Sequence, residues 1–262
     1  MRAGQGGIHA AGVRDPAWRQ IPPDVSDVAR FSRAEFIAER FRYDAGEHVT
    51  ILAPTGYGKT ELLGELTERV ASPELPALFL AAKPRDKTMT RWSTRLDART
   101  TKVWPPKFTM AERWSNKTPS VYTVWPEHKF DPDTDNAHLY EVFRAAMMES
   151  YRAGDRIIDA DELLGLTDVG LERELVTLWT RGRSMGVGVF GASQKPTDIP
   201  TYAYGQASHL FLANDPDKRS RDRFKEIGGV DPKLLEAIVS SLAKYEFLYV
   251  RRDGPKMCIV SA

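Results

Sequence analysis

Short apolar runs alternate with longer amphipathic stretches along this chain. Continuous apolar runs of four to eight residues, bounded by glycine, proline or charged residues, are typical of strands buried on both faces of a parallel sheet. We predict such strands at 46–52, 76–82, 121–125, 186–193 and 209–213, and one more ending at Asp161-Glu162. The pattern therefore predicts a mostly parallel central sheet.

Apolar residues at helical spacing lie between these strands. They predict helices at 31–41 (with Ser32 as a candidate N-cap), 59–70, 137–152, 171–185 and 234–242, and a charged helical segment at 215–224. A polar loop is expected at 126–136. Strand-like runs at 245–250 and 257–260, separated by a turn at 253–255, predict a C-terminal antiparallel hairpin. The fold class is α/β, with helices flanking the sheet.

The first 28 residues are rich in Gly, Ala, Pro and Arg and have no periodicity, which predicts a flexible or loosely docked tail. The remainder, 29–262, suits a single domain. The single cysteine, Cys258, fits a reducing compartment. No run approaches 18 apolar residues and no signal-peptide block begins the chain, so we expect a cytoplasmic protein without a membrane segment of its own.

The stretch Ala53-Pro-Thr-Gly-Tyr-Gly-Lys-Thr60 lies between a predicted strand and a predicted helix. This context is typical of a phosphate-binding loop, whose backbone N–H groups surround a phosphate. Lys59 is suited to the β/γ-phosphates and the Thr60 hydroxyl to Mg²⁺. The predicted nucleotide-binding residues are Thr55, Gly56, Tyr57, Gly58, Lys59, Thr60 and Glu61. The expected ligands are ATP and Mg²⁺; the alternative is a chance match in a surface turn.

A second chemical feature is the acidic pair Asp161-Glu162 at the end of a short strand. In phosphoryl transfer an Asp holds the Mg²⁺ shell and a carboxylate positions and deprotonates the attacking water, which assigns Asp161 to the metal and Glu162 to catalysis. Asp159 lies within the same strand and is an alternative metal ligand. An acid-rich helix N-terminus would also explain the pattern.

Two polar segments follow other strands. Gln194, after the strand at 186–193, carries an amide that can bond both a γ-phosphate oxygen and a water. The segment 83–107 has eight basic and two acidic residues, with Trp92 and Trp104 interleaved. Since Lys+Arg (37) nearly cancels Asp+Glu (36) overall, DNA contact would need such a local patch. The candidate DNA-binding residues are Lys83, Arg85, Lys87, Arg91 and Arg95; the alternative is a solvated helix face over buried tryptophans.

Taken together, the loop at 53–60, Asp161-Glu162 and the segment Arg-Gly-Arg-Ser-Met-Gly-Val-Gly-Val-Phe-Gly-Ala-Ser-Gln-Lys-Pro (181–196) resemble the FtsK/HerA superfamily of DNA-pumping ATPases. Lys83-Pro-Arg-Asp86 is similar to an element of compact members in actinobacteria, their phages and mobile elements. The resemblance covers about 45–250. It implies a RecA-like core in a hexameric ring, with ATP between subunits and double-stranded DNA in the central channel.

The resemblance also implies residue roles. Gln194 would be the nucleotide sensor, and Arg183 would reach into the neighbouring subunit's site. Arg181 is an alternative, and a plain helix-terminal cation would also explain Arg183. The expected function is ATP-driven translocation or packaging of double-stranded DNA by a stripped motor, without a winged-helix sequence reader. The alternatives are a morphogenesis or secretion motor with protein cargo, and a nucleotide-gated scaffold with little turnover.

Overall fold

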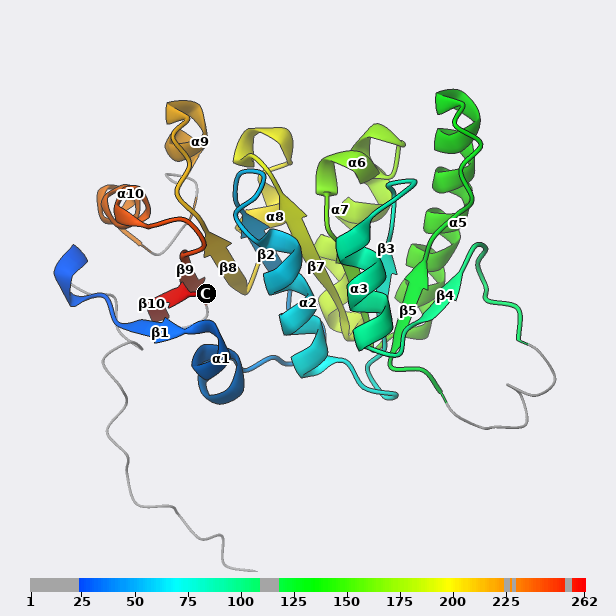
Figure 1. Ribbon diagram of the computed structural model, residues 1–262, viewed down its shortest axis with the longest axis horizontal. Coiled ribbons are helices and arrows are strands. Elements are labelled where there is room, and N and C mark those ends of the chain that lie inside the picture. Colours follow the sequence, from blue (N-terminus) through cyan, green and yellow to red (C-terminus); the bar gives the residue numbers. More distant parts are fainter. Residues whose placement is uncertain (1–23, 109–117, 224–226, 228–229, 253–255) are drawn as a thin grey trace, which may run out of the picture.

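A computed structural model describes residues 24–108, 118–223, 227, 230–252 and 256–262. These residues form one ten-stranded sheet (Figure 1). Its strands are β1 (Arg30–Ser32), β2 (Val49–Leu52), β3 (Ala77–Leu80), β4 (Arg99–Thr101), β5 (Val121–Val124), β6 (Arg156–Ala160), β7 (Val187–Ser193), β8 (His209–Leu212), β9 (Phe247–Arg251) and β10 (Lys256–Ser261). The order is β1-β10-β9-β8-β2-β7-β6-β3-β5-β4. All described pairings are parallel except the two made by β9, so the predicted fold class is confirmed.

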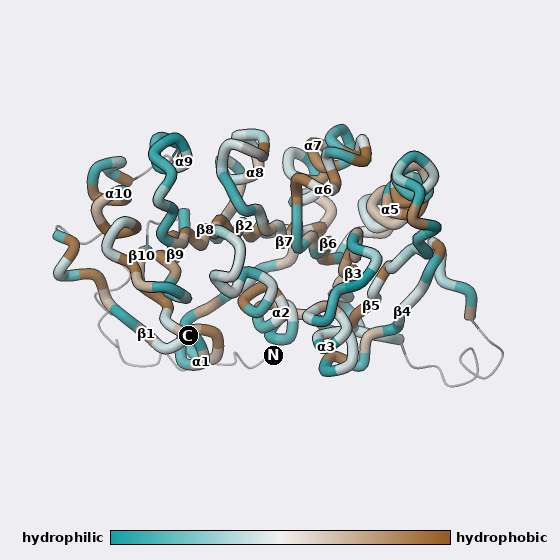
Figure 2. The backbone as a smooth tube through the Cα atoms, turned by 45° about the horizontal axis from the view of Figure 1, so that its top comes forward, coloured by the Kyte–Doolittle hydropathy of each residue, from teal (hydrophilic) through white to brown (hydrophobic). Residues whose placement is uncertain are grey.

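Helices cover both faces of the sheet. They are α1 (Arg33–Glu35), α2 (Lys59–Val70), α3 (Lys87–Arg95), α5 (Pro132–Ala153), α6 (Leu163–Asp168), α7 (Glu172–Arg181), α8 (Tyr202–Gly205), α9 (Lys218–Asp222) and α10 (Pro232–Ser241). Figure 2 shows α1, α2 and α3 on one face and α5 to α8 and α10 on the other. The protein thus has three layers, helix on sheet on helix.

The core is divided by the sheet into two apolar clusters, and successive residues of a strand enter opposite ones. In β3, Leu78 and Leu80 pack with α5, while Ala77 and Phe79 pack on the side of α2. Both faces of a parallel sheet are covered, so its strands are apolar throughout. This burial is the physical reason why continuous apolar runs located the central strands correctly.

The segment predicted as one helix at 31–41 differs in the structure. Phe31 belongs to β1, which pairs with β10 (Phe31 with Val260), and only then do the single turn α1 and a π-helical turn at Phe36–Arg40 follow. Ser32 is the N-cap as predicted, since its Oγ accepts a bond from Glu35 N at 3.2 Å. Pairing along the edge of β10, a distant segment, decides the backbone here.

Two helix boundaries were also wrong, and one strand was missed. Helix α5 begins at Pro132, not at 137, because the Asp131 carboxylate accepts from Thr134 N (2.9 Å) and Pro132 takes the first helical position. Strand β4 was missed: three polar residues at the sheet edge give no periodic signal, and pairing with β5 alone defines them. The helix predicted to reach 185 ends at Arg181, and a 3-10 turn, Gly182–Met185, completes it.

The chain ends were predicted with mixed success. The antiparallel hairpin of β9 and β10 is confirmed, while its turn at 253–255 lies outside the described residues. Of the predicted tail, 1–23 also lies outside them. Residues 25–27 form a 3-10 turn beside α10, and Val28 is buried in the same apolar cluster as that helix. Among the described helices, none is both long and apolar enough to cross a membrane.

The sheet order places three predicted motifs together. β2 lies beside β7, and β7 lies beside β6, with all three strands parallel. Their carboxyl ends therefore meet at one edge, where open α/β sheets bind ligands. The loop after β2, Gln194 after β7 and Asp161-Glu162 after β6 all lie there.

Candidate nucleotide-binding site

The loop between β2 and α2 has the backbone of a phosphate-binding loop. Gly56 (φ 78°) and Gly58 (φ 85°) are both left-handed, a conformation that glycine adopts without strain. Gly58 leads directly into the twelve-residue helix α2, whose first N–H groups have no partner within the helix. Lys59 Nζ lies under the loop and donates to Ala53 O (2.7 Å) and Pro54 O (3.2 Å). The helix dipole, the free N–H groups and this ammonium make the loop an anion site.

A hollow of about 270 Å³ opens above the loop. Its lining combines the loop with side chains from three other strand ends: Thr55, Gly56, Gly58, Lys59, Thr60, Glu61, Lys83, Thr88, Asp161, Glu162 and Gln194. Of the seven predicted nucleotide-binding residues, Tyr57 alone does not line it, because its ring packs on the core cluster next to α2. Thr88, at the start of α3, was not predicted, since only the packing of α3 beside α2 brings it here.

Thr60 and Asp161 form one polar pair in this hollow. Thr60 Oγ1 donates to Asp161 Oδ1 at 2.5 Å, and Lys83 Nζ lies 3.2 Å from Asp161 Oδ2. Burial alone would lower the pKa of Lys83, but the Asp161 and Asp86 carboxylates outweigh it and raise that pKa. A hydroxyl and one carboxylate suit Mg²⁺, which takes few protein ligands and completes its shell with phosphate oxygens and waters. The residues present therefore fit this ion.

Glu162 and Gln194 form a second polar pair. Gln194 Nε2 donates to Glu162 Oε2 (2.9 Å), and Gln194 Oε1 accepts from Thr55 Oγ1 (2.8 Å). The Gln194 amide thus connects the phosphate-binding loop to the acidic pair. Burial raises the pKa of Glu162, with the Gln194 bond and the Lys59 charge acting against it. A carboxylate with a raised pKa is a better proton acceptor.

Asp159, the alternative metal ligand, lies elsewhere. It is fully buried beneath the site and bonded to Thr67 of α2. Burial raises its pKa well above the ordinary value of 3.8. Thr67 Oγ1 is also 3.0 Å from Leu63 O, which can only accept. The one hydroxyl proton goes to that carbonyl, so a protonated Asp159 supplies the other bond. The geometry favours Asp161 for the metal.

Replacement of these two aspartates by asparagine is expected to have opposite effects. Asp159→Asn should retain ATP hydrolysis, whereas Asp161→Asn should lose most of it. Because the raised pKa means that Asp159 ionises only at a cost, its contribution to stability falls as pH rises above 3.8. The free energy of unfolding of Asp159→Asn, measured with urea, should therefore equal or exceed that of the wild type at pH 7. This difference should vanish below pH 4. Loss of hydrolysis in a folded Asp159→Asn would contradict the assignment.

Arg183 lies far from this hollow in its own subunit. It belongs to the turn before β7, at the amino edge of the sheet, where a Cβ on Gly46 would meet its backbone oxygen at 2.7 Å. Arg183 and Arg181 are both exposed, and neither guanidinium has a hydrogen-bond or ion-pair partner in the described part of the chain. Neither arginine can reach the loop of the same chain, so any role in that chemistry requires a second subunit.

Two arginines of the basic segment 83–107 form ion pairs within the chain. Arg91 contacts Glu61, and Arg95 binds Glu68 at 2.6 Å while lying over the Trp92 ring. Trp92 is only 2% exposed, as the alternative of a solvated helix face over a buried tryptophan expects. Lys83 lines the nucleotide hollow instead of a separate surface. Arg85 and Lys87 are exposed, and DNA contact by this segment remains a prediction.

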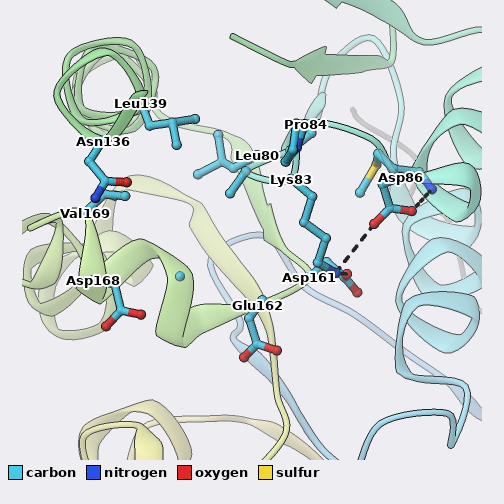
Figure 3. A pocket seen from close by; sticks show the side chains of 14 residues that line it. Leu80, Lys83, Pro84, Asp86, Asn136, Leu139, Asp161, Glu162, Asp168 and Val169 are labelled. Atoms are coloured by element: carbon cyan, nitrogen blue, oxygen red, sulfur yellow. Dashed lines mark hydrogen bonds and ion pairs between the residues drawn. The ribbon is translucent and has the colours of Figure 1, made fainter. Parts of the chain in front are cut away.

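A second hollow of about 400 Å³ adjoins the first and shares Lys83, Asp161 and Glu162 with it (Figure 3). Figure 3 shows Leu80 and Leu139 on one side, with Glu162 and Asp168 across from them. No sequence pattern indicated this hollow, because the ends of β3, α5 and α6 form it only in the folded chain. It extends the site on the side away from the loop and is acidic where it meets Glu162.

The topology and the loop define the fold class of this protein as a RecA-like P-loop NTPase. The five strands β8-β2-β7-β6-β3 carry the loop, the acidic pair and the Gln on adjacent carboxyl ends. No known family model matches the chain, and a search of curated proteins found no match. Solved structures do match it.

Two of these structures are particularly informative. The genome-packaging NTPase B204 from Sulfolobus turreted icosahedral virus 2, in complex with sulfate, matches with a TM-score of 0.57 and 13% identity, over 84% of this chain and 98% of that one. VirB4 of Thermoanaerobacter pseudethanolicus matches with a TM-score of 0.58 and 11% identity, over 82% and 89%. At this identity the likeness shows the fold, and it is the fold expected from the resemblance to FtsK/HerA ATPases.

Proposed function

We propose that this protein is an ATPase that, as an oligomer, couples ATP hydrolysis to translocation or packaging of double-stranded DNA. The observation that carries the proposal is the convergence of the phosphate-binding loop, Asp161-Glu162 and Gln194 on one hollow. The fold shared with a genome-packaging NTPase supports it, as does another structure of that protein, in complex with AMPPCP (TM-score 0.54, 14% identity, 81% of this chain and 96% of that one).

The chemistry follows from the positions of the side chains. The loop N–H groups and Lys59 bind the phosphates, and Thr60 and Asp161 would hold Mg²⁺, which neutralises charge on the β- and γ-phosphates when bound. Glu162 accepts the proton of the attacking water, and the Gln194 amide orients both the carboxylate and the water. Because Gln194 also bonds Thr55, loss of the γ-phosphate is expected to change the loop and the acidic pair together.

The position of Arg183 supports the proposed oligomer. The exposed, unpaired guanidinium lies at the amino edge of the sheet, and the acidic hollow beside Glu162 lies at the carboxyl edge. Two different surfaces with complementary charge suit a head-to-tail contact, which closes into a ring when the rotation permits. In such a ring, Arg183 of one subunit would enter the hollow of the next. A hexamer is the ring size that the sequence resemblance implies.

The two alternatives lack comparable support. A scaffold with little turnover does not need a water-activating carboxylate held by a glutamine amide, yet Glu162 and Gln194 are in place. A motor with protein cargo is not favoured, because the similar structures include a genome-packaging NTPase and a DNA-packaging ATPase from two related viruses. Double-stranded DNA is therefore the proposed cargo, with Arg85 and Lys87 as the exposed basic candidates.

Linear duplex DNA is expected to raise the steady-state ATPase rate several-fold, since a motor hydrolyses fastest when its cargo engages it. The measurement is phosphate release with and without DNA over a range of salt concentrations, with Lys59→Ala as the inactive control. Stimulation should weaken as salt rises, because phosphate contacts release counterions. A wild-type protein that binds ATP but hydrolyses it at the same rate with and without DNA would refute the translocase proposal.

A further inference from the structure

Tyr245 lies against the phosphate-binding loop, although about 185 residues separate them in sequence. It belongs to the turn between α10 and β9, at the same sheet edge as the loop. A Cβ on Gly58 would lie 3.6 Å from Tyr245 Cδ1 and 3.9 Å from Arg33 Nη2. The tyrosine and the arginine therefore flank the last glycine of the loop.

The sheet order tells which end of a bound nucleotide would meet them. Glu162 and Gln194 follow β6 and β7, which lie on one side of β2, whereas Tyr245 precedes β9, beyond β8 on the other side. The terminal phosphate must face Glu162 for water to attack it. The chain of phosphates then crosses the loop, and the sugar and base leave it on the side of Tyr245.

Tyr245 has an uncommon backbone conformation, and its side chain is partly exposed with Lys244 Nζ 4.9 Å from the centre of its ring. Its φ is 70°, left-handed, and its residue is 43% exposed. The turn is fixed by Glu246, whose N–H donates to Ala243 O (3.1 Å) and whose carboxylate accepts from Ala243 N (2.9 Å). Strained residues that the surrounding structure enforces are frequent at ligand sites. A partly exposed aromatic ring beside a phosphate-binding loop is suited to stacking on a base.

Arg33 gives a second, independent observation. Its side chain is only 9% exposed, it lies over the Phe247 ring, and its Nε is 3.7 Å from Glu65 Oε2. Nη2 is itself covered in this structure and has no hydrogen-bond partner among the described residues. A buried guanidinium donor normally has an acceptor. A phosphate or sugar oxygen at the nucleoside end of the ligand would supply one beside Gly58.

We propose that Tyr245 stacks on the base of the bound nucleotide and that Arg33 binds an oxygen at the nucleoside end. This inference rests on the proposed function, since it assumes that the loop binds a nucleoside triphosphate. Stacking on an aromatic ring tolerates every base, because each base has a π-face. Tyr245 thus contributes affinity for nucleosides without selecting adenine over guanine.

The test compares two ligands, ATP and inorganic tripolyphosphate, which lacks the sugar and base. Dissociation constants are measured by calorimetry for the full-length protein with Mg²⁺. Tyr245→Ala is expected to weaken ATP binding about tenfold, which is within the range measured for loss of one base–aromatic stack, and to leave tripolyphosphate binding unchanged. Tyr245→Phe should bind both ligands as the wild type does, and Arg33→Met should also weaken ATP binding.

Phe130 provides a matched control, because it is another exposed aromatic residue (73%) with a left-handed φ of 63°, in the loop before α5. Phe130→Ala should change neither constant. Equal weakening of both ligands by Tyr245→Ala would show that the ring merely supports the loop, and an unchanged ATP constant would show that no stack exists. Both results overturn the inference. They leave the proposed function standing as long as the wild type binds tripolyphosphate and Lys59→Ala does not, because that difference assigns phosphate binding to the loop. A wild type that binds neither ligand overturns the proposed function and the inference together.

Discussion

Replacement of Glu162 by glutamine is expected to lower the rate of ATP hydrolysis by about 10²- to 10⁴-fold, the usual contribution of a general base. The substitution removes the proton acceptor but keeps the shape of the side chain and an oxygen that accepts from Gln194 Nε2. The loop, Lys59 and Thr60 are untouched, so ATP binding should remain. Single-turnover hydrolysis and equilibrium binding, measured on the same preparation, separate the two effects.

Glu172→Gln is the matched control, since Glu172 is an exposed carboxylate in the first turn of α7, away from the hollow. It should hydrolyse ATP as the wild type does. The pH profile gives a second readout. Glu162 must be ionised to accept a proton, and its pKa is raised above the ordinary value of 4.5. As the pH is lowered, the wild type should therefore lose activity at a pH above 4.5. Hydrolysis that persists in Glu162→Gln with this acid limb intact would place the catalytic carboxylate elsewhere.

Removal of Arg183 is expected to lower hydrolysis by about 10³-fold or more, the effect of losing an arginine that stabilises transition-state charge in trans. Because Arg183 lies far from the loop of its own subunit, its loss should affect hydrolysis without affecting ATP binding or folding. Arg183→Ala should bind ATP normally and unfold like the wild type, because the guanidinium is exposed and unpaired in the described chain. Arg181→Ala tests the alternative arginine of the same turn.

A subunit-mixing experiment tests the direction of the contact. Arg183→Ala and Glu162→Gln should each be inactive alone. In an equal mixture, about a quarter of head-to-tail contacts pair an intact Glu162 with an intact Arg183, so activity should return. An arginine that acts within its own subunit gives no recovery on mixing, and full activity of Arg183→Ala alone would remove the residue from the mechanism.

The sequence alone identified the parts whose signal is local. The phosphate-binding loop needs glycines, a lysine and a threonine within eight residues, and the buried strands need continuous apolar runs. The strands were located correctly, and the structure has the loop after β2, the acidic pair after β6 and Gln194 after β7. These features depend on chemistry and burial that neighbouring residues already encode.

Only the tertiary structure decided what depends on contacts between distant segments. Strand β1 exists because β10 offers an edge, and β4 because β5 does. Asp159 in β6 and Asp161 just after it both bond a threonine of α2, but only Asp159 is fully buried, and this burial separates a neutral structural acid beside Thr67 from the acid beside Thr60. Tyr245 reaches Gly58 across the turn before β9, a proximity that no local pattern encodes. Side-chain roles at a site built from several strand ends are set by sheet order, which is a property of the whole chain.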